Sequence, residues 1–216
     1  MVTPPDPRCA DLDDRDAATL RFYGDQAAVY AAHAPDHASR HLAGFLSRLG
    51  AGARILELGC GGGRDSRAML DQGFDLDPTD GSPAIAREAS VRLGRPVRVL
   101  RFDQLDAVSA YDAVWAHASL LHVPRAGLPG VLARIFRSLR PGGLHFANFK
   151  GGGAEGRDAH GRYFNYLSAQ QVGEAYARSA AWDVLSIEEG LGGGYDGRQG
   201  PWIAITVRRP DEASRV

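Results

Sequence analysis

The segment ILELGCGGGRDS, residues 55–66, contains the pattern that decides the fold of this chain. An apolar run that includes Glu57 is followed by four glycines within residues 59–63, and polar residues come next. Glycine adopts backbone conformations that other residues avoid, and its missing side chain lets a ligand approach the main chain closely. In open α/β sheets, ligands bind where a strand ends and a helix begins. The turn therefore predicts a ligand site directly after the first strand.

The residues around the turn indicate which kind of ligand it takes. A phosphate-binding Walker loop ends in Lys followed by Ser or Thr, whereas Arg64 and Asp65 stand in that region here. The dinucleotide fingerprint requires a third glycine, and counting from Gly59 and Gly61 that position is Arg64. Glu57 would repel a pyrophosphate but attract an ammonium or sulfonium group. The turn thus predicts a cationic nucleoside.

Two further acids extend this pattern along the expected sheet edge. Asp80 ends the second expected strand, and Asp103 ends the third. A carboxylate at Asp80 can accept both hydroxyls of a ribose, although an acid there could also merely stabilise the start of the next helix. A carboxylate at Asp103 could accept the exocyclic amine of an adenine. Three acids at three successive strand ends favour a cationic nucleoside over a phosphate.

The rest of the chain alternates short apolar runs with helical stretches. Residues 13–49 have helical periodicity, and Ser82 with Pro83 and the capping box at Ser168–Gln171 predict two helix starts. Pro78 cannot donate to a strand ladder and is a local flaw in the second strand. Strands are expected at 53–59, 74–80, 96–102, 111–116, 144–149, 182–189 and 202–209, and further helices at 64–73 and 124–140. Such alternation indicates an α/β fold with a mostly parallel sheet and helices on both faces.

Composition restricts the class of function. The chain has 216 residues, 44% of them hydrophobic and 24% charged, with a net charge of −1, so we expect no nucleic-acid or membrane partner. No apolar run reaches the ~18 residues of a membrane span, and no secretion signal is evident, so we expect a soluble cytoplasmic protein. Two cysteines, Cys9 and Cys60, predict neither a disulfide nor a zinc site, and no metal is expected.

Five motifs together resemble those of the class I S-adenosylmethionine-dependent methyltransferases: ELGCGGG, PTDGSP, FDQL, YDAVWAHASLLHVP and LRPGGLHF, in this order. The resemblance covers residues 53 to about 150 and implies a Rossmann-like, seven-stranded sheet preceded by N-terminal helices. It also implies S-adenosylmethionine as the cofactor and S-adenosylhomocysteine as its product. The implied cofactor-binding residues are Glu57, Gly59, Cys60, Gly61, Gly63, Arg64, Asp80, Gly81, Ser82, Asp103, Gln104 and Ala116.

The roles that follow from the resemblance differ along this set. The glycines would pack against the methionine part, Asp80 would hold the ribose, and Asp103 with Gln104 would face adenine. Ala116 would close the site near the methyl group, and Arg64 would meet the cofactor carboxylate. The implied organisation is a mobile terminus, 1–12, followed by one methyltransferase domain, 13–210. The domain would consist of N-terminal helices (13–49), a cofactor-binding core (53–149), a substrate lid (150–166) and a C-terminal helix with strands (167–210).

The acceptor side is open to two interpretations. His122 could act as a general base for a hydroxyl or amine acceptor, or could simply cap the following helix. The glycine-rich segment 150–166 could be a lid over the substrate or a solvated loop. As a lid, it would supply Lys150, Arg162 and Tyr163, with Tyr195 on a second rim. Tyr23 and Tyr30 could cover the cofactor or pack in the core.

We therefore expect a methyltransferase that acts on a small polar or anionic molecule, because the segments near the expected methyl group carry His122, Lys150, Arg157 and Arg162, and acids are few there. One alternative is a module that binds the cofactor without catalysis. A second, a nucleic-acid methyltransferase, is disfavoured by the charge and by AHAS, residues 116–119, where many amino-methylating relatives have an NPPY-like tetrapeptide. The oligomeric state does not follow from the sequence.

Overall fold

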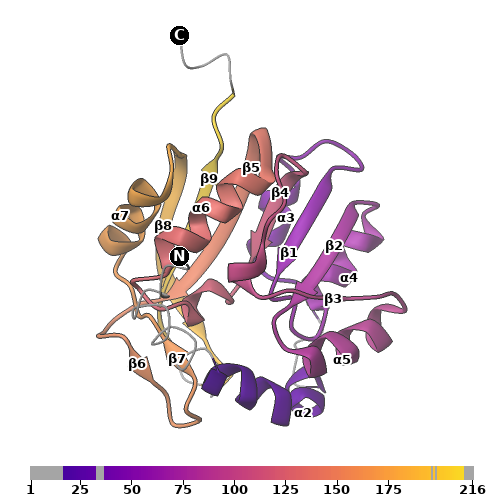
Figure 1. The fold of residues 1–216 in the computed structure, drawn as a ribbon, viewed down its shortest axis with the longest axis vertical. Coiled ribbons are helices and arrows are strands. Elements are labelled where there is room, and N and C mark those ends of the chain that lie inside the picture. Colours follow the sequence, from indigo (N-terminus) through magenta and orange to yellow (C-terminus); the bar gives the residue numbers. More distant parts are fainter. Residues whose placement is uncertain (1–16, 33–36, 196, 198, 212–216) are drawn as a thin grey trace, which may run out of the picture.

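The computed structural model describes residues 17–32, 37–195, 197 and 199–211. The expected mobile terminus, 1–12, which includes Cys9, lies outside the described residues. A seven-stranded sheet in the order β3-β2-β1-β4-β5-β9-β8 forms the centre of the molecule (Figure 1). Its strands are β1 (Arg54–Leu58), β2 (Asp75–Asp80), β3 (Arg98–Val99), β4 (Tyr111–Ala116), β5 (Leu139–Lys150), β8 (Asp183–Gly193) and β9 (Gln199–Arg208).

The sheet is mostly parallel, as predicted. Strands β1 to β5 pair in parallel, whereas β9 runs antiparallel to β5 and β8 runs antiparallel to β9. Central parallel strands are covered on both faces and read as continuous apolar runs, which is why Ile55 to Leu58 are all buried despite the acid among them. The predicted α/β fold is confirmed.

Helices connect these strands and flank the sheet. Residues 17–25 are helical, and the later helices are α2 (Ala27–Ala32), α3 (Leu42–Leu46), α4 (Arg64–Asp71), α5 (Pro83–Leu93), α6 (Leu128–Ser138) and α7 (Ala169–Ser179), with 3-10 turns η1 (Phe102–Gln104) and η2 (Leu120–His122). The side chain of Ser82 caps α5, with Pro83 in the first turn, and Ser168 and Gln171 form the capping box of α7. Both helix starts agree with the sequence signals. Among the described residues, no helix is long and apolar enough to cross a membrane.

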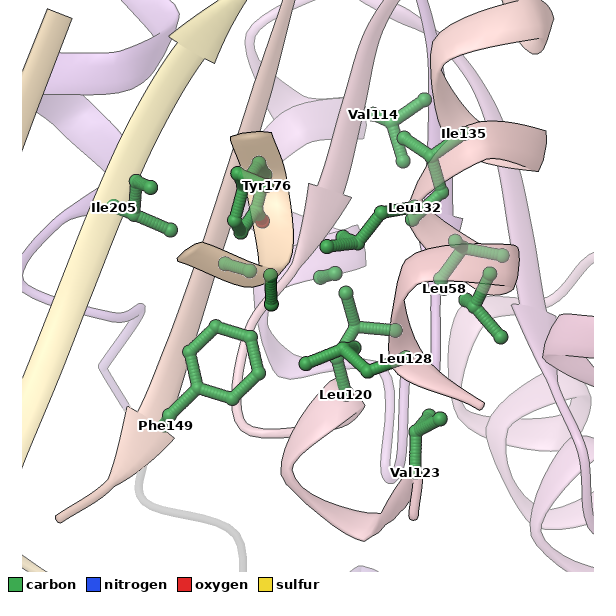
Figure 2. Close-up of a cluster of buried hydrophobic side chains, with 14 of the residues drawn as sticks. Leu58, Val114, Leu120, Val123, Leu128, Leu132, Ile135, Phe149, Tyr176 and Ile205 are labelled. Atoms are coloured by element: carbon green, nitrogen blue, oxygen red, sulfur yellow. The ribbon is translucent and has the colours of Figure 1, made fainter. Parts of the chain in front are cut away.

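The core has one layer on each face of the sheet. On one face, Leu132 and Ile135 of α6 lie beside Val114 of β4, in a cluster that includes Phe149 and Tyr176 (Figure 2). On the other face, α3 packs on the central strands through Leu42, Phe45 and Leu46. Phe45 contacts Trp115, which stacks on Phe146 at a ring distance of 4.3 Å. The two layers hold β1 and β4 rigidly, and these strands position the glycine turn.

The two edge strands differ from their expected lengths, and β5 begins at Leu139 rather than at residue 144. The third strand was expected over 96–102, but β3 consists of Arg98 and Val99 alone, because only Thr79 and Asp80 of β2 pair with it. Pro78 precedes this short pairing, so its missing N–H costs no bond to β3. At the opposite edge, β8 continues to Gly193 because its glycines pair with β9 as far as Gln199. Strand β8 therefore reaches to within two residues of Tyr195, the residue expected on a second rim.

The segment expected as a substrate lid contains a small hairpin. Strand β6 (Gly156–Arg157) pairs with β7 (Tyr163–Phe164). Figure 1 shows this hairpin and α2 at the same end of the sheet, where β5 ends. Ligands of open α/β sheets bind beyond the carboxyl ends of the strands. The hairpin and the N-terminal helices therefore enclose the edge at which the glycine turn lies.

Candidate functional site

The glycine turn between β1 and α4 adopts a conformation that requires glycine. Gly59, Gly61 and Gly63 all have positive φ angles, of 78°, 55° and 79°. A Cβ atom at Gly59 would lie only 2.6 Å from Cβ of Ser119. Side chains are therefore excluded from the turn by backbone conformation and, at Gly59, also by space.

Two cavities meet at this turn. A large cleft of about 940 Å³ extends over the turn, the N-terminal helices and the hairpin of β8 and β9. A small pocket of about 70 Å³ lies between the helix of residues 17–25, the end of β2 and η1. Six residues line both cavities and so mark their boundary: Tyr23, Tyr30, Gly59, Gly61, Ala118 and His122.

Asp80 lines the small pocket and also holds the turn in place. Its carboxylate accepts the N–H of Gly61 at 3.1 Å and the N–H of Ser82 at 2.8 Å. Burial raises the pKa of Asp80 to about 6, against the effect of these two hydrogen bonds. Gly81, Ile85 and Phe102 line the pocket beside it. The carboxylate is therefore positioned by the main chain and remains at the wall of the pocket.

Glu57 is a buried acid beneath the turn. Its side chain is 3% exposed, lines the large cleft and accepts a hydrogen bond from the hydroxyl of Ser66. Burial, with a smaller contribution from the negative charge of Asp65, raises its pKa to about 8. A cation in the adjoining cleft would favour the ionised form. The site therefore holds an acid that a positively charged ligand would ionise.

Arg64 belongs to a network that the sequence did not indicate. Its Nε donates to Asp65 at 2.9 Å, and the same carboxylate accepts the N–H of Ser39 and Nε1–H of Trp115. The ring of His117 stacks on Trp115 and lies 3.4 Å from Arg64. Asp65 lies two residues after the glycine turn, but the spacing gave no signal that it would anchor the arginine at the cleft wall.

His122 has partners on both ring nitrogens. Nε2 lies 2.8 Å from the hydroxyl of Tyr23, and Nδ1 lies 2.6 Å from the backbone oxygen of Tyr163. Burial lowers the pKa of His122 to about 4. The N–H of Tyr163 in turn donates to the hydroxyl of Thr19 at 3.0 Å. The N-terminal helix is thus bonded to the η2 turn and to the hairpin at the cleft.

The residues expected on the acceptor side divide into two groups. Lys150, Arg162 and Tyr195 line the large cleft. Tyr163 does not line it, and its hydroxyl donates to Glu155. Arg162 is 2% exposed and is held by Asp158, with Nη2 2.7 Å from the carboxylate. The guanidinium also stands over the rings of Phe22, Phe164 and Tyr195, at 4.8, 5.3 and 5.3 Å from their centroids.

Several predicted cofactor residues do not line either cavity: Gly63, Ser82, Asp103, Gln104 and Ala116. Gly63 and Ser82 are the N-caps of α4 and α5, and Ala116 is fully buried in the core. The side chain of Asp103 is 56% exposed and pairs with Arg101 at 2.7 Å, while Gln104 accepts the N–H of Arg101. The remaining residues of the set, Glu57, Gly59, Cys60, Gly61, Arg64, Asp80 and Gly81, all line one cavity or both.

Among the described residues, no group of three or more His, Cys, Asp or Glu side chains is arranged to hold a metal ion. Cys60 is buried and unpaired by disulfide, and burial raises the pKa of its thiol. The polar groups at the turn are therefore carboxylates, hydroxyls and backbone amides, which suit a polar organic ligand.

Comparison with known proteins identifies a methyltransferase domain in part of the chain. Residues 55–143 match the family model of a methyltransferase domain. The chain is similar to ubiquinone biosynthesis O-methyltransferases of Xanthomonas oryzae, at 31% identity over 103 residues that cover 44% of this chain and 42% of the relative. It therefore spans about two fifths of the length of the curated relatives it matches.

Solved structures extend the similarity over the fold. One is the 1,6-didemethyltoxoflavin N1-methyltransferase of Burkholderia thailandensis, solved with 1,6-didemethyltoxoflavin and S-adenosylhomocysteine bound. The two structures superpose with a TM-score of 0.75 at 20% sequence identity, and the match covers 98% of this chain and 94% of that chain. A second solved structure, a [4+2]-cyclase, matches with a TM-score of 0.64 at 18% identity, and the match covers 93% of this chain and 96% of that chain. Residues 55–143 thus match a methyltransferase domain, and the chain as a whole shares the fold of these solved structures.

Proposed function

We propose that this chain transfers the methyl group of S-adenosylmethionine to a small polar or anionic acceptor. The observation that carries the proposal is the boundary between the two cavities. There, a glycine turn that excludes side chains is held by Asp80 and lies over the buried acid Glu57. A ligand with a nucleoside at one end and a cation in the middle matches these groups.

The residues present fit the cofactor. Ser119 lines the small pocket, and its buried hydroxyl has no hydrogen-bond partner among the residues that the structure describes, so it can bond a nucleoside. Asp80 would accept the ribose hydroxyls beside Gly81, Ile85 and Phe102. Glu57 and Arg64 would face the amino and carboxylate groups of the methionine part. Contacts of Asp103 and Gln104 with adenine, and closure near the methyl group by Ala116, stay predictions.

The cofactor, when bound, supplies a sulfonium methyl whose carbon bonds to an acceptor lone pair while the S–C electron pair stays on sulfur. The chain contributes alignment of the two reactants and exclusion of water. Holding reactants in attack geometry can lower a barrier by ~7–11 kcal/mol. No covalent bond between protein and substrate is required.

The acceptor class rests on the walls of the large cleft. Lys150 and Arg162 contribute cationic groups, and Tyr195 and Trp202 contribute aromatic surface. Cations in a site of low dielectric favour anionic or electron-rich ligands. The relatives named above include O-methyltransferases and an N-methyltransferase whose ligand is 1,6-didemethyltoxoflavin. These names support a small organic acceptor with an oxygen or nitrogen nucleophile.

The proposal is tested by calorimetry and by turnover. S-adenosylmethionine and S-adenosylhomocysteine should bind at micromolar concentrations, whereas tighter binding of NAD would contradict the proposal. Methyl-labelled cofactor is then incubated with small phenols, carboxylates and amines. Arg162→Ala should lose activity on anionic acceptors while it keeps its affinity for the cofactor. Equal rates of this variant and the wild type on every acceptor would place the acceptor elsewhere.

A cofactor-binding protein without methyl transfer is the second candidate, because the [4+2]-cyclase shows that chains of this fold carry other activities. Persistent cofactor binding with no methylated product from any acceptor would favour it. A nucleic-acid methyltransferase is disfavoured by the net charge of −1, and a strongly salt-dependent shift of labelled RNA or DNA would revive it. A cytoplasmic location stays a prediction that cell fractionation tests.

A further inference from the structure

The pair formed by Tyr23 and His122 lies where the two cavities meet. The Tyr23 hydroxyl is 2.8 Å from Nε2 of His122, and both residues line the large cleft as well as the small pocket. If the nucleoside occupies the small pocket and the acceptor occupies the cleft, the reacting methyl group must pass this boundary. Tyr23 and His122 are therefore the polar side chains nearest to the expected transfer path, together with Tyr30.

The hydrogen bonds of the pair fix its protonation. The backbone oxygen of Tyr163 can only accept, so Nδ1 of His122 carries the ring proton in the neutral state. Nε2 is then an acceptor, and the hydroxyl of Tyr23 must be its donor. Both ring nitrogens are engaged within the protein. His122 could take a proton from a substrate only by releasing Tyr23.

The surroundings oppose a charged imidazole at this position. His122 is buried, which lowers its pKa to about 4, and the nearby cations Arg162 and Lys150 act in the same direction. The acid Asp158 opposes them, but it is bound to Arg162. On the N-terminal helix the facing group is Tyr23, whose own pKa is raised by burial, so its hydroxyl stays protonated. The pair is neutral at pH 7.

We propose that Tyr23 contacts the reacting methyl group and that His122 is a positioning residue that orients the Tyr23 hydroxyl and takes no proton from the acceptor. The inference rests on the proposed function and deepens it. The oxygen of Tyr23 also has a hydrogen bond with Arg162 and lies beside Tyr30. Once its proton is donated to His122, one lone pair is left for a further group, and a phenol oxygen attracts a positively charged sulfonium methyl. An acceptor must then bring its own lone pair, and any proton that it carries leaves to solvent.

The protein contains a matched control for this arrangement. In the core, the hydroxyl of Tyr176 lies 2.9 Å from Nε2 of His145, and Nδ1 of that ring lies 3.0 Å from the backbone oxygen of Val114. Burial lowers the pKa of His145 to about 4 as well. The same three groups are thus bonded in the same way, but neither Tyr176 nor His145 lines the large cleft or the small pocket. Tyr176→Phe removes an equivalent bond away from the cofactor.

The first experiment measures protonation without any ligand. Histidine ¹⁵N NMR of the whole chain between pH 5 and 8 should show His122 as the neutral Nδ1–H tautomer throughout, and His122→Gln identifies its signal. The Nε2–H tautomer, or titration of His122 between pH 6 and 7, would overturn the positioning role.

The second experiment measures affinities for S-adenosylmethionine and S-adenosylhomocysteine, which differ in the methyl group and its charge. Tyr23→Phe and His122→Ala should each weaken binding of S-adenosylmethionine about tenfold and of S-adenosylhomocysteine less than twofold. His122→Gln, whose side-chain oxygen can accept from Tyr23 but cannot act as a base, should restore most of the loss. Tyr176→Phe should leave the ratio of the two affinities at its wild-type value.

The outcomes separate this inference from the proposed function. A wild-type protein that binds neither ligand refutes the proposed function, while the NMR experiment still decides the protonation of the pair. A protein that binds both ligands, but whose Tyr23→Phe variant keeps the wild-type ratio of affinities, overturns the methyl contact alone. Failure of His122→Gln to recover what His122→Ala loses would also count against the positioning role.

Discussion

Replacing Glu57 by Gln should stabilise the protein, and the effect should depend on pH. Burial, followed by repulsion from Asp65, raises the pKa of Glu57 from its ordinary value of 4.5 to about 8. An acid with a raised pKa binds more protons in the folded state, so its contribution to stability falls as pH rises from about 4.5 to about 8. Glutamine has nearly the shape of the protonated acid and keeps an acceptor for the hydroxyl of Ser66.

The magnitude follows from the two pKa values. Integrating the proton linkage between 4.5 and 8 gives an unfavourable contribution of roughly 3 kcal/mol at pH 7 and roughly 1 kcal/mol at pH 5. Glu57→Gln removes this contribution. Urea unfolding at the two pH values should therefore show the variant to be more stable than the wild type, with the larger gain at pH 7.

Cofactor binding should change in the opposite direction. At pH 7 the free protein holds Glu57 mostly protonated, and a cation bound beside it favours ionisation, so binding should release protons. Calorimetry in two buffers with different ionisation enthalpies measures this release, which Glu57→Gln should reduce while it weakens binding. A variant that is destabilised equally at pH 5 and pH 7 would refute the reasoning, because it would mean that Glu57 is ionised and fully satisfied in the free protein.

Three further changes test other parts of the site and the core. Asp80→Ala should weaken cofactor binding by ~1.5–3 kcal/mol, the scale of hydrogen bonds to a charged group. It should also lower the melting temperature, because two backbone amides lose their acceptor. Unchanged affinity in a folded variant would mean that Asp80 does not hold the ribose. Gly61→Val should abolish cofactor binding measured by calorimetry, because the φ angle of Gly61 is 55° and the ring of Tyr30 lies 3.4 Å from the new Cβ. Near-normal affinity would show that the glycine turn does not hold the cofactor. Burial lowers the pKa of His145 to about 4, so the contribution of this residue to stability should fall by about 3 kcal/mol as pH drops from 6.5 to 4. Urea unfolding of His145→Gln beside the wild type isolates that contribution, and a difference between the two proteins that does not change with pH would contradict the assignment of a neutral ring.

Local signals in the sequence predicted much of the fold. The glycine turn, the cap at Ser82 and the capping box at Ser168 are each determined by residues within a few positions of one another, and the structure contains all three. The apolar stripe of α6 is equally local. Strand lengths were less predictable, because β3 and β8 end where their partner strands stop pairing.

The site was predictable only where a residue's partners are close in sequence or belong to the turn. The Tyr23–His122 bond joins positions 99 apart, and the bond from Trp115 to Asp65 joins positions 50 apart. Periodicity and spacing do not indicate such contacts. Asp103 shows the reverse case, since a neighbour two positions away, Arg101, pairs with the carboxylate that the strand-end argument assigned to adenine.

The helix of residues 17–25 has a consequence for the timing of turnover. Thr19, Leu20 and Tyr23 form one wall of the small pocket, and its volume of about 70 Å³ is well below the ~300–1,000 Å³ of ordinary ligand sites. For a nucleoside to occupy that pocket as proposed, we expect this helix to move outward, whereas an acceptor could exchange through the wider cleft. The bonds of Thr19 and Tyr23 to Tyr163 and His122 resist the movement. On the proposed function, the residence time of the cofactor is thereby linked to the docking energy of one short helix, and weakening that docking should speed cofactor exchange.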